Sequence, residues 1–489
     1  MIKILIGYPP VESTGGTPTL GQNRQFQWFS NPCLIFPVVM AGAATMLKQK
    51  GYDVKWVDAV AEGLNKQQYF DIIKRYHPDL IAFETKTPVI RQHWALINEI
   101  KEILPDTKAV IMGDHVTYNP LETMEKSAVD YVLCGGDYDF SLSSLVDYIA
   151  GTLGFMPSGF FYRDSGRIES SGDFRLDHDL DKAPLIDREL AKWRLYDREY
   201  NLMGKPYFYI MSGRDCWWGK CRFCSWTLLY PGFRTRSVEN VLDELEYLVE
   251  RYGAREIFDD AGTLMTGEWL IRLCRGLIER GLNKKIYYSC NMRFGVLKQA
   301  DFDLMKQAGF RLLKFGMESA SQDTLDRLGK GFRVSEIEDG CRMARKAGLT
   351  VHLTIMVGYP WETKADAMNT FKLVKRLMKS GLADLLQATV LVPYPGTPLW
   401  REARKKGWFL FDHQAYERYD MNEPVLKTKD GNPEAVARIC GRIYTIFLSP
   451  AYVLRRLSKI RSREALLFHL KGIRAVRGHL KDFLIKKAY

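Results

Sequence analysis

The chain has 489 residues, of which 46% are apolar and 26% charged, and its net charge is +12. These values are ordinary for a soluble globular protein of two to four domains, each large enough to bury its own core. No uninterrupted apolar run approaches the roughly 20 residues needed to cross a bilayer, which excludes a membrane-spanning helix.

The chain begins with a strand-like run, Met1–Gly7, which has neither the basic start nor the cleavage site of a signal peptide. We therefore expect a cytoplasmic protein whose cysteines start reduced. The odd cysteine count, nine, also argues against a disulfide framework.

Residues 1–150 alternate apolar runs with amphipathic stretches such as Ile90–Leu104. This alternation predicts an α/β domain in which helices cover both faces of a parallel sheet. The expected strands are Ile2–Ile6, Val54–Val57, Leu80–Phe83, Ala109–Met112 and Tyr131–Leu133.

Glycines and small hydroxyl residues gather where these strands end. Parallel sheets bind ligands in the crevice beyond the carboxyl ends of their strands, and such residues leave room for a bulky flat ligand. Ordinary turns between a strand and a helix remain the alternative. The segments are Tyr8–Pro10, Glu84–Thr87, Gly113–Thr117 and Cys134–Asp137.

Residues 151–205 are polar and turn-rich, and we interpret them as a connector. The alternation resumes in residues 206–400, where Ser237 is a good N-cap and Gly253 ends the following helix. Six β/α units are too few for an eight-fold barrel, so we predict a partial barrel. The expected strands are Tyr207–Met211, Glu256–Phe258, Ile286–Cys290, Leu312–Gly316, Val351–Val357 and Leu386–Val392.

Residues 401–489 are expected to form a helical, basic region. Ala435–Leu448 and Ala451–Ala488 look helical, with Pro450 between them.

Three cysteines, Cys216, Cys221 and Cys224, follow the first expected barrel strand with the spacing C-x4-C-x2-C. Three thiolates this close together can hold three irons of a [4Fe–4S] cluster and leave the fourth iron open for a small molecule.

Two other interpretations of this spacing are open. A structural zinc site needs a fourth ligand, for which His178 and Cys274 are the nearest candidates. Plant-type ferredoxins share the local spacing, but they are small all-β modules. Cys33 and Cys134 stand alone in the sequence, so we expect them to be buried structural residues.

With these motifs, the chain resembles the radical S-adenosylmethionine enzymes that carry an N-terminal cobalamin-binding domain. The resemblance covers about residues 1–430. The usual family spacing is C-x3-C-x2-C, so this loop has one extra residue, while Phe223 matches the family's aromatic position. The resemblance implies a Rossmann-like (flavodoxin-like) cobalamin-binding domain at 1–150, a partial (β/α)6 barrel at 206–400, and three cofactors: a [4Fe–4S] cluster, S-adenosylmethionine and cobalamin.

The resemblance also implies cofactor-binding residues in the barrel. Asp259 and Asp260 end the second strand, where the family receives the methionine amine of S-adenosylmethionine. Asn291 and Arg293 follow the third strand and Glu318 ends the fourth, where the family binds the carboxylate and the ribose. These residue types suit a ligand with an amine, a carboxylate and a diol.

In the N-terminal domain, the resemblance implies a set of residues that contact cobalamin. No histidine stands in the Asp-x-His-x-x-Gly frame that supplies cobalt with a lower ligand in other cobalamin proteins. We therefore expect His115 to line the cofactor, or to be a plain turn histidine, rather than to bind cobalt. The full set is Pro9, Pro10, Thr85, Gly113, Asp114, His115, Thr117, Gly135, Gly136 and Asp137.

The basic character of the chain belongs to its C-terminal tail. Residues 451–489 hold eleven Lys or Arg against two acids, a net charge of +9 out of the total +12. The tail is either a helical cap with a solvated cationic face or a peripheral contact with an anionic membrane surface, where each basic residue adds roughly 1 kcal/mol. Nucleic acid is not expected as a partner, because the tail has few aromatic residues.

These inferences give one principal hypothesis. The enzyme methylates an unactivated carbon of a small-molecule substrate that is large and apolar, lipid- or pigment-like, or a secondary metabolite, and a flavodoxin- or ferredoxin-type electron donor reduces the cluster. One alternative uses the same cofactors for oxidation, cyclisation or ring rearrangement. Another is a non-catalytic cobalamin-binding sensor. The sequence singles out no catalytic acid or base.

Overall fold

The N-terminal lobe is built on the parallel sheet that the sequence predicts. The computed structural model describes residues 1–13, 15–18, 20, 26–196, 202–458, 460 and 463–484, without the side chains of 463, 464 and 484. Five parallel strands follow the order β4-β1-β5-β6-β7. They are β1 (Lys3–Tyr8), β4 (Asp53–Asp58), β5 (Leu80–Glu84), β6 (Lys108–Met112) and β7 (Tyr131–Leu133). This is the flavodoxin-like order, and its ligand-binding switch point lies between β1 and β5.

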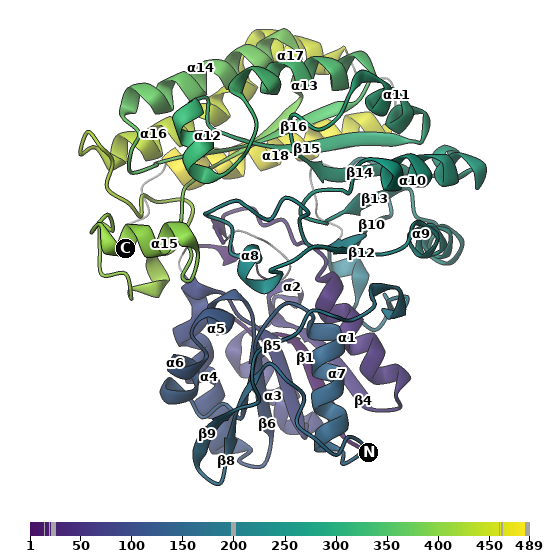
Figure 1. The fold of residues 1–489 in the computed structure, drawn as a ribbon, viewed down its shortest axis with the longest axis vertical. Coiled ribbons are helices and arrows are strands. Elements are labelled where there is room, and N and C mark those ends of the chain that lie inside the picture. Colours follow the sequence, from purple (N-terminus) through teal and green to yellow (C-terminus); the bar gives the residue numbers. More distant parts are fainter. Residues whose placement is uncertain are drawn as a thin grey trace.

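Helices cover this sheet in the lower lobe of Figure 1, where α1 and α7 pack against each other. The predicted helix at Ile90–Leu104 is confirmed as α4. The helices of the lobe are α1 (Val38–Gln49), α2 (Ala59–Glu62), α3 (Lys66–Tyr76), α4 (Ile90–Ile103), α5 (Asp114–Tyr118), α6 (Pro120–Lys126) and α7 (Tyr138–Ile149).

Two strands that we had not expected extend the sheet beyond β7. They are β8 (Phe160–Asp164) and β9 (Arg167–Ser170), and both pair antiparallel. Ser165 and Gly166 join them with positive φ angles of 49° and 81°, as a two-residue hairpin turn requires. The segment interpreted as a connector therefore begins with a hairpin of the N-terminal sheet.

The second sheet confirms the predicted partial barrel. Six parallel strands lie in sequence order: β10 (Tyr207–Ile210), β13 (Glu256–Asp259), β14 (Tyr287–Met292), β15 (Phe310–Glu318), β16 (Thr350–Val357) and β17 (Leu385–Val390). The predicted cap is also present, because the Ser237 side chain accepts a hydrogen bond from the backbone N–H of Asn240.

Helices follow each of the first five strands of this barrel. They are α9 (Val238–Tyr252), α10 (Glu268–Glu279), α11 (Gln299–Gln307), α12 (Gln322–Leu328), α13 (Val334–Lys346) and α14 (Lys364–Ser380). Three short elements lie near the cysteines: β11 (Gly213–Arg214), α8 (Trp226–Leu229) and β12 (Arg234–Thr235).

The C-terminal region returns to both lobes. After α15 (Pro398–Lys405), the chain crosses the N-terminal lobe, where the Tyr416 hydroxyl donates to Glu122 at 2.8 Å. Helices resume with α16 (Pro433–Tyr444), α17 (Pro450–Leu457) and α18 (Arg463–Leu484). Helix α16 packs on β16 and β17, and α18 packs on α16 and on β3 (Trp28–Phe29), the second strand of a small hairpin with β2 (Thr17–Pro18).

These elements confirm helical structure for most of the predicted tail, whereas residues 406–432 lie mainly in loops. Within the basic tail, residues 459, 461, 462 and 485–489 lie outside the described residues.

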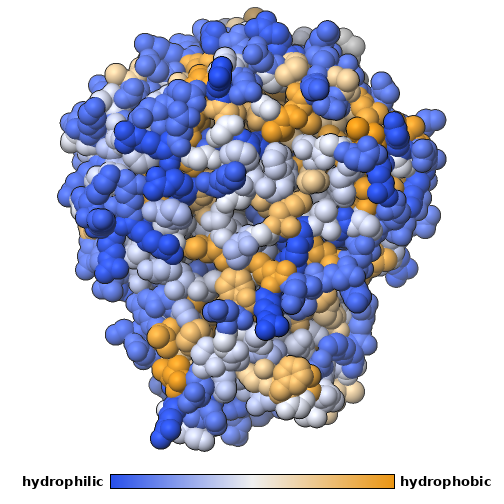
Figure 2. Space-filling model, in the orientation of Figure 1, coloured by the Kyte–Doolittle hydropathy of each residue, from blue (hydrophilic) through white to orange (hydrophobic). Residues whose placement is uncertain are grey.

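The two lobes share an apolar core. The core of the N-terminal lobe continues into barrel-side residues such as Trp226, Tyr230, Tyr394 and Trp400, and a second core fills the space between the barrel and its helices. The face shown in Figure 2 is mostly hydrophilic, with apolar residues in scattered groups. Within the described part of the chain, no helix combines the length and apolar character needed to span a membrane.

Candidate active site

A cavity of about 240 Å³ lies at the carboxyl ends of the barrel strands. Three parts of the chain line it. The barrel contributes Cys216, Cys221, Phe223, Cys224, Asn291, Arg293 and Glu318 of the predicted residues, together with Lys314, Lys330 and Gln387. The N-terminal lobe contributes Asn31, Cys33 and Ile35, and α18 contributes Ala475 and His479. Cys33, expected to be buried and structural, is therefore part of this wall.

The loop between the first two cysteines is anchored through its tryptophans. Trp217 Nε1 donates to the Leu264 carbonyl at 3.0 Å, and Trp218 Nε1 donates to the Gly329 carbonyl at 2.7 Å. A Cβ atom on Gly331 would lie only 2.3 Å from the Trp218 ring, so glycine is needed there. The four residues between Cys216 and Cys221 are thus held against the neighbouring barrel loops.

Arg293 and Lys330 place two cations beside the cysteines. The guanidinium carbon of Arg293 lies 3.6 Å from the Trp218 ring centroid, a cation–π stack, and Arg293 donates to the Lys330 carbonyl. The Lys330 ammonium lies 3.0 Å from a Glu318 carboxylate oxygen. Burial alone would lower the pKa of Lys330, but the Glu318 charge, the nearby Cys221 and the hydrogen bond to Glu318 together raise it above its usual value. The Lys330 ammonium therefore stays charged.

Asp259 and Asp260 lie behind the cavity wall. The Asp259 carboxylate accepts from the backbone N–H groups of Ser212 and Ala261, both at 3.1 Å, and from the Tyr288 hydroxyl at 2.7 Å. Burial raises the pKa of Asp259, and these hydrogen bonds oppose the rise. The Asn291 amide donates to Asp260 at 3.2 Å. Neither aspartate is among the lining residues, whereas Asn291 is.

The predicted cobalamin residues converge at one edge of the N-terminal sheet, outside the 240 Å³ cavity. The Thr117 hydroxyl accepts from the Gly135 N–H at 3.1 Å, and a Cβ on Gly113 would lie 2.3 Å from the Thr85 carbonyl. The Asp114 carboxylate, which accepts from the His115 N–H at 2.8 Å, lies in the same group of loops. Pro9 and Pro10 directly follow β1.

His115 lies fully buried among these loops. Its Nδ1 is 3.2 Å from the Thr87 hydroxyl, and its ring meets the Tyr416 ring edge-on at 4.6 Å. Burial lowers the pKa of His115 to about 4, so the imidazole is neutral at physiological pH.

Buried hydroxyls at the boundary between the lobes fit a polar cofactor. Tyr138, beside Gly135–Asp137, and Ser225, beside Cys224, each bury a hydroxyl that has no hydrogen-bond partner among the described residues. Buried hydroxyls in proteins nearly always have a partner. The amide groups around a cobalamin ring could supply one here.

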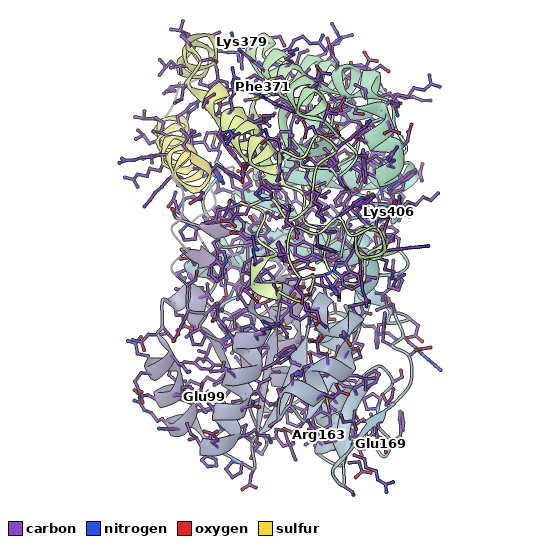
Figure 3. All side chains as sticks on the ribbon, turned by 90° about the vertical axis from the view of Figure 1, so that its left-hand side faces the viewer. Glu99, Arg163, Glu169, Phe371, Lys379 and Lys406 are labelled. Atoms are coloured by element: carbon purple, nitrogen blue, oxygen red, sulfur yellow. The ribbon has the colours of Figure 1, made fainter. Side chains whose placement is uncertain are left out.

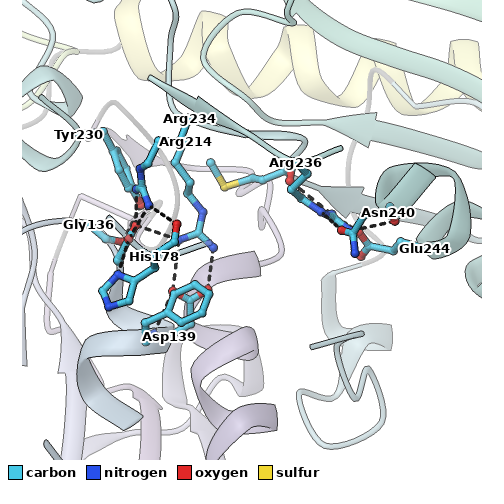
Figure 4. Close-up of polar contacts among 12 residues, drawn as sticks. Gly136, Asp139, His178, Arg214, Tyr230, Arg234, Arg236, Asn240 and Glu244 are labelled. Atoms are coloured by element: carbon cyan, nitrogen blue, oxygen red, sulfur yellow. Dashed lines mark hydrogen bonds and ion pairs between the residues drawn. The ribbon is translucent and has the colours of Figure 1, made fainter. Parts of the chain in front are cut away.

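A largely buried ion network joins the two lobes through arginines on either side of the cysteine motif in the sequence (Figure 4). Arg214 pairs with Asp139 at 2.6 Å and with Asp137 at 3.4 Å, and Arg234 donates to both Asp137 oxygens at 2.8 Å. His178 Nδ1 lies 2.9 Å from Asp137. Burial would raise the pKa of Asp137, but the hydrogen bonds and these positive charges outweigh it and lower the pKa to about 2.

The Asp137 carboxylate has ionic partners that the sequence did not predict. It lies at the sheet edge as predicted, but its carboxylate is engaged by cations of the cysteine-bearing segment. The adjacent Gly136 is covered by Tyr230, whose hydroxyl donates to the Gly136 carbonyl at 2.7 Å.

The donor set suits a cluster rather than one metal ion. Each thiolate of a [4Fe–4S] site binds a different iron, so the sulfurs need to face one cavity without meeting at one point. The three cysteines are free thiols that line the same cavity. Among the residues that the structure describes, no three His, Cys, Asp or Glu side chains gather as ligands of a single metal ion.

Comparison with known proteins agrees with this geometry. Residues 210–374 match the Radical SAM superfamily, and residues 36–139 match the B12 binding domain. An uncharacterized methyltransferase of Pyrococcus horikoshii is 27% identical over 493 residues, which cover 99% of each chain. The anaerobic magnesium-protoporphyrin IX monomethyl ester cyclase of Cereibacter sphaeroides is 27% identical over 80% of this chain and 64% of its own.

Two solved structures share most of this fold. The cobalamin-dependent S-adenosylmethionine radical enzyme OxsB superposes with a TM-score of 0.69 over 98% of this chain and 72% of its own, at 14% identity. The radical S-adenosylmethionine methyltransferase TsrM of Kitasatospora setae has a TM-score of 0.65 over 83% of this chain and 76% of its own, at 17% identity.

A half-barrel with three cysteines at its mouth, packed on a flavodoxin-like lobe, defines a radical enzyme with a second cofactor-carrying domain. The chain is a B12-binding radical SAM enzyme, related to cobalamin-dependent radical SAM methyltransferases and cyclases. Its cofactors are a [4Fe–4S] cluster, S-adenosylmethionine and cobalamin.

Proposed function

We propose that this enzyme transfers a methyl group to an unactivated carbon of a small-molecule substrate. The observation that carries the proposal is the shared cavity, which brings residues of the N-terminal lobe within the same 240 Å³ space as the three cysteines. When bound, the cluster and S-adenosylmethionine supply the hydrogen-abstracting radical, and cobalamin supplies the methyl group. A methyl carrier on one lobe and a radical generated on the other must meet in such a space.

The residues of the chain position these groups. Cys216, Cys221 and Cys224 hold three irons, and Arg293 offers its charge to the carboxylate of S-adenosylmethionine. Asn291 and Glu318 supply polar contacts for the rest of that cofactor. The apolar core shared by the lobes keeps water away from the reacting carbon. A one-electron donor of the flavodoxin or ferredoxin type completes the reaction.

A methyltransferase relative that aligns along the whole chain supports methyl transfer. The cyclase relative supports the alternative, in which the same cofactors drive oxidation or ring closure. The products distinguish the two. Methyl transfer consumes S-adenosylmethionine in two ways and forms equal amounts of 5′-deoxyadenosine and S-adenosylhomocysteine, whereas cyclisation forms 5′-deoxyadenosine without sustained S-adenosylhomocysteine.

The experiment uses protein purified anaerobically from cells supplied with cobalamin, after iron and cobalt have been measured. The holoenzyme is incubated with a reductant, methyl-deuterated S-adenosylmethionine and an apolar-metabolite extract of the source cells. We expect about four irons and one cobalt per chain, and a metabolite that gains a deuterated methyl group. Sustained 5′-deoxyadenosine formation without S-adenosylhomocysteine would support cyclisation instead.

We expect Arg293→Gln to weaken S-adenosylmethionine binding by roughly 10- to 100-fold, because a charge-assisted contact with the cofactor carboxylate is lost. Equilibrium dialysis with labelled cofactor measures the change, and the iron content should stay near that of the parent enzyme. Arg222→Gln is the matched control. It removes a loop arginine that pairs with Glu402 at 2.9 Å outside the cavity, so the affinity should not change. Equal affinities of the two variants would rule out the assigned role of Arg293.

A further inference from the structure

Large exposed apolar side chains gather in one stretch of the C-terminal region. Over the rest of the described chain such residues are spread widely, as single surface apolar residues normally are. The gathered residues are Leu448, Val453, Leu454, Leu457, Leu466, Leu467, Leu470 and Ile473, with exposures between 39% and 67%. Exposed apolar side chains grouped in this way are typical of an interaction site.

Helix α18 places its share of these residues on one face. Leu466, Leu470 and Ile473 recur at three- and four-residue steps, so they lie on one side of the helix. The same spacing continues with Arg474, Arg477 and Lys481, which are also exposed. The outer face is therefore apolar toward the start of α18 and cationic toward its end.

The opposite face of α18 closes the active-site cavity. Ala475 and His479 line the cavity. The Asp482 carboxylate accepts from the Ser30 N–H at 3.0 Å and from the Ser30 hydroxyl at 2.5 Å. These contacts tie the helix to the N-terminal lobe, so α18 is the wall between the cavity and the outside.

Helix α17 is held in register beside α18. Arg456 pairs with the buried Asp384 at 3.5 Å, and its guanidinium carbon lies 5.7 Å from the Phe468 ring of α18. Arg455 donates to the carbonyls of Met378 and Lys379 at the end of α14. With these arginines directed inward, Leu454 and Leu457 remain on the outside. Figure 3 shows the yellow C-terminal helices at the outer edge of the upper lobe.

We propose that the outer face of α17 and α18 binds an anionic membrane surface. Apolar residues flanked by lysine and arginine suit a helix that lies in the headgroup region of a bilayer, where anionic lipids attract the cations. A second copy of the chain is a poor occupant, because two tails that each carry +9 would repel.

This placement also deepens the proposed function, on which the following step rests. With one face of α18 in the bilayer and the other lining the cavity, the substrate class that fits is an apolar molecule that partitions into lipid. The membrane contact itself does not depend on the reaction that the enzyme performs.

The test is flotation of the full-length holoenzyme with two kinds of vesicle, phosphatidylcholine alone and phosphatidylcholine with phosphatidylglycerol. We expect binding to the anionic vesicles and at least tenfold weaker binding to the neutral ones. The triple variant L466S/L467S/L470S should reduce binding by about a hundredfold or more, because three apolar side chains no longer enter the bilayer. The triple variant R474Q/R477Q/K481Q should reduce it by about a hundredfold, and raised salt should have a similar effect.

Two control variants carry substitutions of the same kinds in the N-terminal lobe. Leu121→Ser changes an exposed leucine of the N-terminal lobe, and K74Q/R75Q/K126Q removes three exposed cations there. Both controls should bind as the parent does. The proposal is overturned if the parent binds neither vesicle, if the controls lose as much binding as the tail variants, or if sedimentation shows a dimer that L466S/L467S/L470S converts to a monomer. Because the test needs no turnover, failure of the methyl-transfer assay would not alter its outcome.

Discussion

The triple variant C216A/C221A/C224A is expected to lose its iron completely and to form no 5′-deoxyadenosine. Without these thiolates, three irons of the cluster have no protein ligand. The chain should still fold, because the three side chains line a cavity and are only half-buried. Iron analysis, the visible spectrum and a 5′-deoxyadenosine assay under anaerobic conditions measure the effect.

Cys341→Ala is the control for this variant. Cys341 is buried in the barrel core on α13, far from the cysteine motif in sequence. Its replacement should cost about 1 kcal/mol of stability through the small cavity that it leaves, with iron content unchanged. Retention of four irons by the triple variant would show that the cluster binds elsewhere.

Arg214→Leu is expected to lower the free energy of unfolding by roughly 3–5 kcal/mol, the range for a buried ion pair that loses one partner. Asp139 would be left in a buried site without the 2.6 Å contact to Arg214. The substitution should loosen the contact between the lobes as well as the segment that leads to Cys216. Urea unfolding measures the stability, and hydrogen exchange follows residues 136–140 and 214–224 locally.

Arg236→Leu provides the comparison. Arg236 also forms a largely buried pair, with Glu244 at 2.5 Å, but both residues belong to the barrel (Figure 4). It should lower stability without raising exchange at residues 136–140. Equal exchange in that segment for both variants would show that Arg214 has no special part in joining the lobes.

Low pH should weaken the ion pairs between the two lobes in the parent protein. The pKa of Asp137 is about 2, below the ordinary value of 3.8. The ionised carboxylate is therefore more stable in the folded state than in the unfolded state. Its contribution is therefore complete above about pH 4 and is lost as the pH falls toward 2. Asp137→Asn should remove this part of the pH dependence of stability, measured by urea unfolding at several pH values.

Most of the fold could be predicted from the sequence, because each parallel strand is a short buried apolar run between turn residues. The edge hairpin β8–β9 was missed for the opposite reason. Its residues are mostly polar and partly exposed, and only the Ser165–Gly166 turn indicated it. The path of residues 406–432 over the N-terminal lobe depends on single long-range contacts, such as that of Tyr416 with Glu122, which leave no periodic pattern.

The candidate site likewise contains residues that the sequence predicts and residues that it does not. The cysteines and Arg293 stand in a motif or at a strand exit, and the structure places them around one cavity. Lys330 follows α12 between two glycines and was not predicted as a site residue. Its ion-pair partner, Glu318, was predicted. His479 and Asn31 could not be predicted, because only tertiary packing brings α18 to the β2–β3 region. Asp137 follows the end of a strand, as predicted, but the sequence did not predict its ion pairs with Arg214 and Arg234.

The position of α18 in the wall has a consequence for how the protein is made. The ribosome adds Ala475 and His479 long after the cysteines, so a growing chain has its three thiols before it has the last side of the cavity. The wall that α18 forms is therefore the last side of the cavity to be synthesised.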